Sequence, residues 1–353
     1  MLGVGGGVKS WCGPWACWSR VTLVAWYRCA EFVWSGCVMS GFIEELREKI
    51  ARLKEKRRAV ILAHNYQLPE VQDVADLVGD SLELARAAME TDADVIVFAG
   101  VRFMAEMAAA LNPDRVVLHP VPEAGCPLAD SLAREDVARA REEHPGAPFL
   151  VYVNSPLWAK AEADYVVTSA SAAKLASILA REGVEKIVFG PDRNLAEYVE
   201  EVTGVKTVPV PTRGHCPVHE FLISPYYVRK AREKWGDRAA ILVHPEAPRE
   251  SRRMADFVGS TSQMIRAVAK FRDRSVVLLG TEEGLVYRAR RLNPGVRVEP
   301  LNPIAVCIDM KKITLQAIAD ALEKMEPKVR VDPNVARRAR EVIEESVRIV
   351  TRS

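Results

Sequence analysis

The regular part of the chain opens with hydrophobic positions at helical spacing. Phe42, Leu46, Ile50 and Leu53 fall on one face of a helix, with charged residues between them. The continuous apolar run 59–63 follows and predicts a strand that is buried on both faces. Segments of these two kinds alternate along the rest of the chain, which indicates parallel strands connected by helices.

The pattern occurs three times. Strand-like segments end at His64, Tyr152 and His244, and each is followed by an aspartate 12 residues later and a serine or threonine 17 residues later. A further strand-like segment then ends in glycine, and another leads into a proline-containing loop that carries a cysteine. The repeated residues are Asp76, Asp164 and Asp256; Ser81, Ser169 and Thr261; Gly100, Gly190 and Gly280; and Cys126, Cys216 and Cys307. These matches predict three homologous units.

Each unit reads as strand, helix, short strand, helix, strand, helix, strand. This order predicts an α/β fold of three homologous three-layer αβα domains with parallel sheets, arranged around a pseudo-threefold axis. Ligands bind at the carboxyl ends of parallel strands, so the active site is expected at the central junction. The predicted parts are a misassigned or disordered extension (1–38), an N-terminal helix (39–58), repeat 1 (59–130), repeat 2 (147–220), repeat 3 (238–311) and C-terminal helices (312–353).

Composition changes this picture only at the N-terminus. The 353 residues include 49 Lys+Arg and 47 Asp+Glu, a net charge of +2, and residues 1–38 supply all of that excess. The same segment holds four of the seven cysteines and five of the seven tryptophans. We expect translation to begin near Met39, with a dispensable extension as the alternative. A signal peptide and a transmembrane helix are disfavoured because the apolar run 21–26 is too short and charged residues follow it.

The near-neutral charge gives no sign of a nucleic-acid or membrane partner. We also expect a cytoplasmic protein. The three cysteines after Met39 all occupy one repeat position, which predicts a shared metal centre. Disulfides are disfavoured because three is an odd number and the expected compartment is reducing. Three thiolates suit a zinc ion with one water, or a [4Fe-4S] cluster with one open iron that acts as a Lewis acid. The pattern alone leaves iron and zinc open.

Ten motifs together resemble the quinolinate synthase family. They are His64-Asn-Tyr-Gln67, Val78-Gly-Asp-Ser81, Phe103-Met-Ala-Glu106, Gly125-Cys126, Tyr152-Val-Asn154, Thr168-Ser169, Gly214-His-Cys-Pro-Val-His219, His244-Pro-Glu246, Gly259-Ser-Thr261 and Cys307-Ile-Asp-Met310. The resemblance runs from about Phe42 to about Met325, and residues 1–38 have no counterpart in it. Ala247 departs from the family, in which many members have a further cysteine there, but this position is outside the cluster ligands.

The resemblance implies a transferase that condenses iminosuccinate (iminoaspartate) with dihydroxyacetone phosphate, giving quinolinate, phosphate and water in de novo NAD biosynthesis. It implies a [4Fe-4S] cluster held by Cys126, Cys216 and Cys307, with one iron open. It implies substrate contacts from His64, Ser81, Tyr152, Val153, Asn154, Ser169, His244, Pro245, Glu246 and Thr261. It also implies a functional link to L-aspartate oxidase or aspartate dehydrogenase as the source of iminosuccinate.

The residue types suggest roles for two groups of these side chains. Ser81, Ser169 and Thr261 are each expected to open a helix, where hydroxyls and free N–H groups bind anions. His64 and His244 are expected to donate hydrogen bonds to carboxylates, or to transfer protons near neutral pH.

Two further residues are candidates for general acid–base catalysis, namely Tyr66 and Glu246, which would act together with the two histidines His64 and His244 during enolisation and dehydration. His219 is expected either to contact substrate or to hydrogen-bond a cluster thiolate.

Three other readings of the chain stay open. A diphthamide-synthesis enzyme also resembles three domains with one cluster cysteine each, although the motifs at His64 and His244 favour quinolinate synthase. The other two are a non-catalytic iron–sulfur or zinc protein and a zinc hydrolase.

Overall fold

The computed structural model describes residues 38–352 of the chain. The chain divides into two compact units, Met1–Glu44 and Glu45–Ser353. The first is described only from Val38, where helix α2 (Val38–Arg57) begins, so the extension expected over residues 1–38 otherwise lies outside the described residues. Helix α2 covers most of the segment 39–58, over which the apolar stripe predicts an N-terminal helix.

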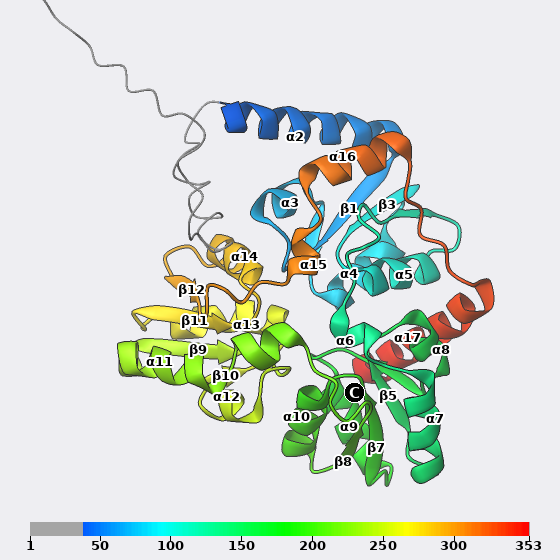
Figure 1. Cartoon of the computed structure of the whole chain (residues 1–353), viewed down its shortest axis with the longest axis vertical. Helices are drawn as coiled ribbons and strands as arrows, with labels where there is room; N and C mark the ends of the chain where they lie inside the picture. Colours follow the sequence, from blue (N-terminus) through cyan, green and yellow to red (C-terminus); the bar gives the residue numbers. More distant parts are fainter. Residues whose placement is uncertain (1–37, 353) are drawn as a thin grey trace, which may run out of the picture. The chain divides into compact units, whose positions relative to one another are not determined.

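Three parallel four-stranded sheets form the second unit (Figure 1). Their strands are β1 (Ala59–His64), β2 (Leu77–Gly79), β3 (Val95–Ala99) and β4 (Val116–Leu118); β5 (Phe149–Tyr152), β6 (Tyr165–Val167), β7 (Lys186–Gly190) and β8 (Lys206–Pro209); and β9 (Ala239–Val243), β10 (Phe257–Val258), β11 (Val276–Gly280) and β12 (Val298–Pro300). All three sheets have the same order, in which the second strand lies at one edge, followed by the first, third and fourth. This shared order confirms the predicted α/β class and the threefold repeat.

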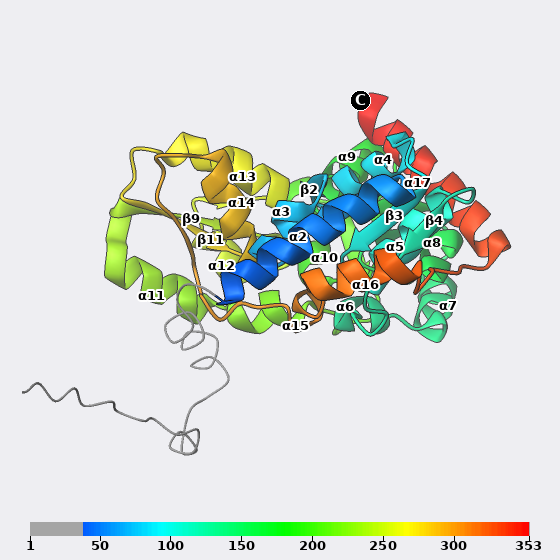
Figure 2. The same ribbon diagram turned by 90° about the horizontal axis from the view of Figure 1, so that it is seen from above.

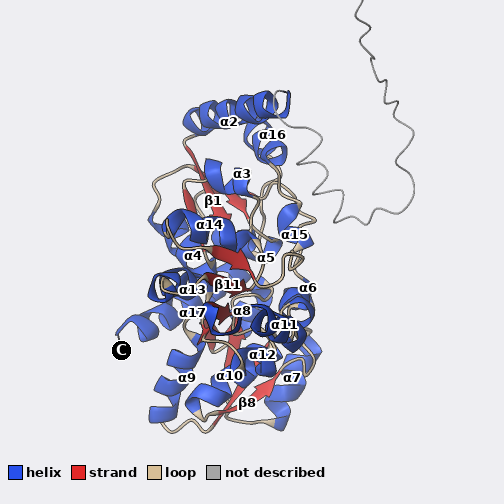
Figure 3. Ribbon diagram, turned by 90° about the vertical axis from the view of Figure 1, so that its left-hand side faces the viewer, coloured by secondary structure: helices blue, strands red, loops and turns tan. Residues whose placement is uncertain are grey.

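Helices connect the strands and surround the sheets (Figure 3). They are α3 (Pro69–Val74), α4 (Ser81–Glu90), α5 (Arg102–Leu111), α6 (Pro127–Asp130), α7 (Arg134–Glu143), α8 (Leu157–Glu162), α9 (Ala172–Arg181), α10 (Arg193–Thr203), α11 (Pro225–Trp235), α12 (Arg249–Arg253), α13 (Thr261–Val268), α14 (Gly284–Leu292), α15 (Ile308–Lys311), α16 (Leu315–Lys324) and α17 (Pro333–Arg352). A π-helical turn covers Val218–Leu222. Within residues 38–352, no helix combines the length and apolarity needed to cross a bilayer.

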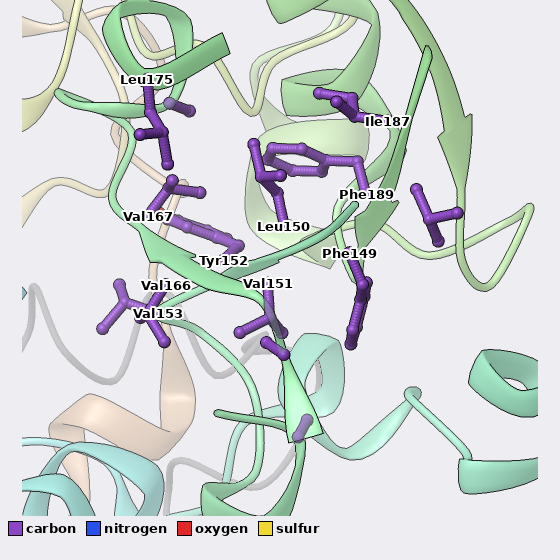
Figure 4. Packing of buried hydrophobic residues seen from close by; sticks show 14 of the residues in the cluster. Phe149, Leu150, Val151, Tyr152, Val153, Val166, Val167, Leu175, Ile187 and Phe189 are labelled. Carbon is purple, nitrogen blue, oxygen red and sulfur yellow. The ribbon is translucent and has the colours of Figure 1, made fainter. Parts of the chain in front are cut away.

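Apolar strand residues form the core of each repeat. Phe149, Leu150 and Val151 of β5 are all fully buried, because helices cover both faces of the sheet. Figure 4 shows Phe149 and Val151 on one side of this strand and Leu150 on the other, beside Phe189 of β7. This two-sided burial explains why the strands read as continuous apolar runs rather than as alternating patterns.

The repeated aspartates hold the first strand of each sheet. In each repeat, one carboxylate oxygen accepts a hydrogen bond of 2.7 Å from a backbone N–H of that strand. The donor and acceptor pairs are Ile61 and Asp76, Phe149 and Asp164, and Ile241 and Asp256. These aspartates therefore recur because the fold needs them, and they lie outside the set of predicted site residues.

The C-terminal helix α17 packs against α8, α5 and strand β6, and Figure 2 shows it beside α8. Its Ser346 hydroxyl accepts a hydrogen bond of 2.9 Å from the backbone N–H of Val166 in β6. Because β6 is an edge strand, this contact satisfies a backbone donor that would otherwise lack a partner in the sheet.

Candidate active site

A cavity of about 390 Å³ lies where the carboxyl ends of the strands of all three repeats meet. The predicted site residues that line it are His64, Tyr66, Ser81, Cys126, Tyr152, Val153, Asn154, Ser169, Cys216, His244, Glu246, Thr261 and Cys307. The structure thus brings together every predicted site residue except Pro245. That residue is absent from the lining, and its carbonyl oxygen lies 3.4 Å from Nη1 of the buried Arg252.

The three hydroxyl residues line the cavity, and two of them open a helix as expected, since α4 begins at Ser81 and α13 begins at Thr261. Asp80 and Ser260, which immediately precede Ser81 and Thr261, accept the capping hydrogen bonds of α4 and α13. At Ser169 the predicted helix start is wrong, since α9 begins three residues later. The capping position is therefore one residue earlier in two repeats, which leaves the hydroxyls of Ser81 and Thr261 free of a capping role.

A chain of polar contacts links two tyrosines from different repeats. The Tyr66 hydroxyl lies 2.6 Å from Thr281 Oγ1, which lies 2.9 Å from His219 Nε2. His219 Nδ1 lies 3.1 Å from Glu246 Oε2, an ion-pair distance without the alignment of a hydrogen bond. The Tyr152 hydroxyl donates a hydrogen bond of 2.5 Å to Glu246 Oε1. The contacts connect all three repeats through side chains that are buried, apart from the half-buried Tyr66.

The negative charge in this series of polar contacts is concentrated at Glu246. Burial alone would raise the pKa of Glu246, but the nearby His219 and His244 and the hydrogen bond from Tyr152 lower it below its ordinary value. Burial, together with the charge of Glu246, raises the pKa of Tyr66 and Tyr152 well above 10. At neutral pH the chain therefore contains one carboxylate between two protonated phenols.

His64 and His244 occupy equivalent positions and make equivalent contacts. In each case Nδ1 accepts a hydrogen bond from the backbone N–H two residues later. The donor to His64 is Tyr66, at 3.2 Å, and the donor to His244 is Glu246, at 3.3 Å. Burial lowers the pKa of both imidazoles to about 3, so both are neutral at neutral pH. The Nε2 atom then carries the proton, and that of His244 lies 3.2 Å from Ser169 Oγ. These contacts favour the predicted hydrogen-bonding role and argue against proton transfer by the two histidines.

Cys126, Cys216 and Cys307 are free, partly exposed thiols at the cavity. Cys126 and Cys307 directly precede the short helices α6 and α15, and Cys216 lies two residues before the π-helical turn that begins at Val218. Backbone N–H groups two or three residues after each cysteine donate hydrogen bonds to its sulfur. Burial raises the pKa of Cys126 to about 12 and that of Cys307 to about 11, so these thiols are protonated at neutral pH. Metal binding would displace those protons, and the backbone donors would stabilise the resulting thiolates.

The spacing of possible ligand atoms distinguishes two kinds of metal site. Cys216, His219 and Glu246 present ligand atoms within 4.8 Å of one another, close enough for a single ion. The three cysteine sulfurs form no such group among the described residues. The three cysteines, one from each repeat, line the same cavity, where three thiolates could hold a group larger than a single ion.

Several residues that the sequence analysis missed support the site. Thr281 is fully buried and bridges Tyr66 and His219. Two buried acids, Asp192 and Glu282, lie next to the cysteine loops. Thr281 follows a repeated glycine, and the two acids come two residues after the repeated glycines of their own repeats. Inspection of the residues after each glycine could therefore have found all three.

A buried lysine, Lys160 on α8, lies outside the cavity lining. Its Nζ donates a hydrogen bond to the carbonyl oxygen of Ser155 and lies 5.1 Å from the centre of the Phe103 ring. Burial lowers the pKa of Lys160 to about 7, and the negative charge of Glu106 only partly opposes this shift.

Comparison with known proteins gives consistent matches over the second unit. A family model described as quinolinate synthetase A protein matches residues 48–348. A quinolinate synthase from Pyrococcus horikoshii is 49% identical over 301 residues, which cover 85% of this chain and 97% of the relative. A quinolinate synthase from Thermococcus onnurineus is 47% identical and covers 86% and 97% of the two chains. A glutamate racemase structure from Thermus thermophilus covers 82% of this chain and 94% of its own, but its TM-score of 0.17 and identity of 18% carry no argument. The chain therefore belongs to the quinolinate synthase family of NAD-biosynthetic enzymes.

Proposed function

We propose that the protein is a cytoplasmic quinolinate synthase that condenses iminosuccinate with dihydroxyacetone phosphate. The products are quinolinate, inorganic phosphate and two molecules of water, so the reaction is a transfer that forms carbon–carbon and carbon–nitrogen bonds. An oxidation of aspartate, by L-aspartate oxidase or aspartate dehydrogenase, would supply iminosuccinate. The observation that carries this proposal is that three cysteines and both ends of the tyrosine-to-tyrosine series of polar contacts line one cavity.

The chemistry of the donor set fits a [4Fe-4S] cluster held by Cys126, Cys216 and Cys307. When bound, such a cluster with one open iron supplies a Lewis acid for a substrate hydroxyl or carboxylate. The fit is supported by the backbone N–H groups directed at each sulfur and by the position of all three cysteines at one cavity.

The other residues of the cavity would bind and orient the two substrates. His64 and His244, as neutral imidazoles, would donate from Nε2 to the carboxylates of iminosuccinate. The hydroxyls of Ser81 and Thr261 and the amide of Asn154 add uncharged donors from all three repeats. An anionic substrate would thus be held by hydrogen bonds, with no lysine or arginine side chain in the described lining.

The chain of polar contacts provides a route for protons during enolisation and dehydration. Glu246 would accept a proton from a substrate carbon, directly or through Tyr152. Tyr66 would donate a proton to a departing hydroxyl group. His219 and Thr281 lie between the two ends, so a proton taken up at Glu246 would be returned at Tyr66 once the 3.1 Å contact between His219 Nδ1 and Glu246 Oε2 aligns as a hydrogen bond.

The experiment that tests this proposal is an anaerobic assay for quinolinate from the two substrates, with iron, sulfide and zinc counts and an absorbance spectrum. We expect about four irons per chain, a brown chromophore and quinolinate formation. Iron without quinolinate would favour a diphthamide-type enzyme or an iron–sulfur carrier. Stoichiometric zinc without a chromophore would favour a single-ion site at Cys216, His219 and Glu246, the alternative supported by their 4.8 Å grouping.

A further inference from the structure

Each repeat has the same backbone contact between its cysteine loop and the start of the helix that follows its third strand. A backbone N–H at that helix start donates to the carbonyl oxygen two residues before the cysteine, at 2.8, 2.8 and 2.9 Å. The donors are Arg102, Arg193 and Glu283, and the acceptors are Ala124, Gly214 and Ala305. The residues immediately before the donors are therefore structurally equivalent, and they are Val101, Asp192 and Glu282.

Asp192 and Glu282 each join two backbone segments through one carboxylate. One oxygen of Asp192 accepts a 2.7 Å hydrogen bond from Leu195 at the start of α10, and the other accepts a 3.2 Å bond from the Cys216 N–H. Glu282 likewise accepts a 2.7 Å bond from the N–H of Gly284 and a 3.0 Å bond from the Cys307 N–H. The same device thus occurs in two repeats with acids of different length.

Both carboxylates are buried, with exposed fractions of 0% and 1%. Burying a carboxylate is unfavourable unless hydrogen bonds or a cation compensate it. Lys311 lies 3.0 Å from Glu282, whereas none of the ion pairs among the described residues includes Asp192. The backbone N–H groups are therefore the main compensation at Asp192, and one of the two belongs to a cysteine.

The first repeat lacks this contact. Val101 occupies the equivalent position, is buried, and makes no side-chain cap for α5. Among the hydrogen bonds of residues 38–352, none joins the Cys126 N–H to a side chain. The loop of Cys126 is therefore fixed differently from the other two.

We propose that Asp192 and Glu282 are positioning residues that hold the loops of Cys216 and Cys307 before any metal binds. The proposal rests on the proposed function in that the held sulfurs serve a shared metal centre. The carboxylates act through the backbone N–H groups of the cysteines, and Glu282 also lines the cavity.

The first test is residue-resolved hydrogen exchange on the metal-free, reduced full chain. In the unaltered protein we expect the Cys216 and Cys307 amides to exchange about tenfold more slowly than the Cys126 amide, as the loss of one buried hydrogen bond implies. This measurement needs no variant, so it decides the proposal even where a substitution prevents folding. Equal rates at the three amides would overturn the proposal.

Two variants sharpen this test. An amide has one acceptor oxygen, so Glu282→Gln and Asp192→Asn can each keep only one of their two hydrogen bonds. Glu282→Gln should speed exchange about tenfold at Cys307 and leave Cys216 unchanged, and Asp192→Asn should do the reverse. Asp256→Asn is the matched control, because Asp256 also accepts a backbone N–H but holds Ile241 of β9 and is absent from the cavity lining. Faster exchange at all three cysteines together in either variant would contradict a positioning role.

The second test follows iron release to a chelator after anaerobic reconstitution. Residues that support metal ligands typically change affinity by about 10- to 100-fold, so both variants should release iron faster by that factor and Asp256→Asn should not. Unchanged release in both variants would overturn the proposal. An unaltered protein that binds no iron would refute the proposed function, whereas the exchange experiment would still decide this inference.

Discussion

Thr281 is the residue whose substitution tests the proton route most directly. It supplies the one hydroxyl between Tyr66 and His219, with contacts of 2.6 and 2.9 Å, and it is fully buried. Thr281→Val keeps the shape of the side chain and removes only the hydroxyl. The change therefore breaks the chain of polar contacts without opening a cavity in the core.

The expected changes in stability and turnover follow from the hydrogen bonds that His219 and Tyr66 lose in Thr281→Val. His219 is 2% exposed, so an unsatisfied Nε2 should lower the free energy of unfolding by about 1 to 3 kcal/mol. The Tyr66 hydroxyl lines the cavity, where water can replace the lost hydrogen bond. The loss of this bond should therefore change the free energy of unfolding little. General acid–base catalysis contributes about 10²- to 10⁴-fold, which corresponds to about 3 to 5 kcal/mol of barrier. The activation barrier should therefore change by more kcal/mol than the free energy of unfolding does.

The assay is anaerobic quinolinate formation, combined with thermal unfolding and an iron count for each variant. Thr281→Ser restores a hydroxyl at the same position and is the matched control, which should keep most of the turnover. Near-normal turnover in Thr281→Val, with an unchanged iron count, would refute the proposed route. Equal losses in Thr281→Val and Thr281→Ser would attribute the effect to packing and not to proton transfer.

Three further predictions concern other parts of the chain. Glu246→Gln should keep the iron count but lose most quinolinate formation, and normal activity would remove Glu246 from the mechanism. Cys307→Ala should lose both the brown absorbance and turnover; an intact chromophore would mean that Cys307 is not a ligand. Lys160 has a folded-state pKa of about 7, against 10.5 for an ordinary lysine. Between these values the unfolded chain binds the extra proton, so stability should rise with pH by at most about 1.4 kcal/mol per unit. Urea unfolding from pH 7 to 10 should show this slope relative to Lys160→Met, and parallel curves would contradict it.

The amino-acid sequence by itself determined the fold class, the threefold repeat and the common position of the three cysteines. These features depend on local periodicity and on chain spacing, which survive in each copy of a repeat. His64, the last residue of β1, and His244, which follows β9, could be found in the same way, because the end of an apolar run marks the carboxyl edge of a parallel sheet. The sequence was less reliable at Ser169, where a helix start was expected but α9 begins three residues later, at Ala172.

Only the tertiary structure decided which side chains meet. Tyr66 and Thr281 are 215 positions apart in the chain, and Tyr152 and Glu246 are 94 apart, so no local pattern connects them. Their contacts arise because three sheets direct their carboxyl edges into one cavity, where side chains from different repeats compete for the same partners. Burial in that cavity also decides protonation, since it makes His64 neutral although its type and position alone suggest a group that titrates near neutral pH.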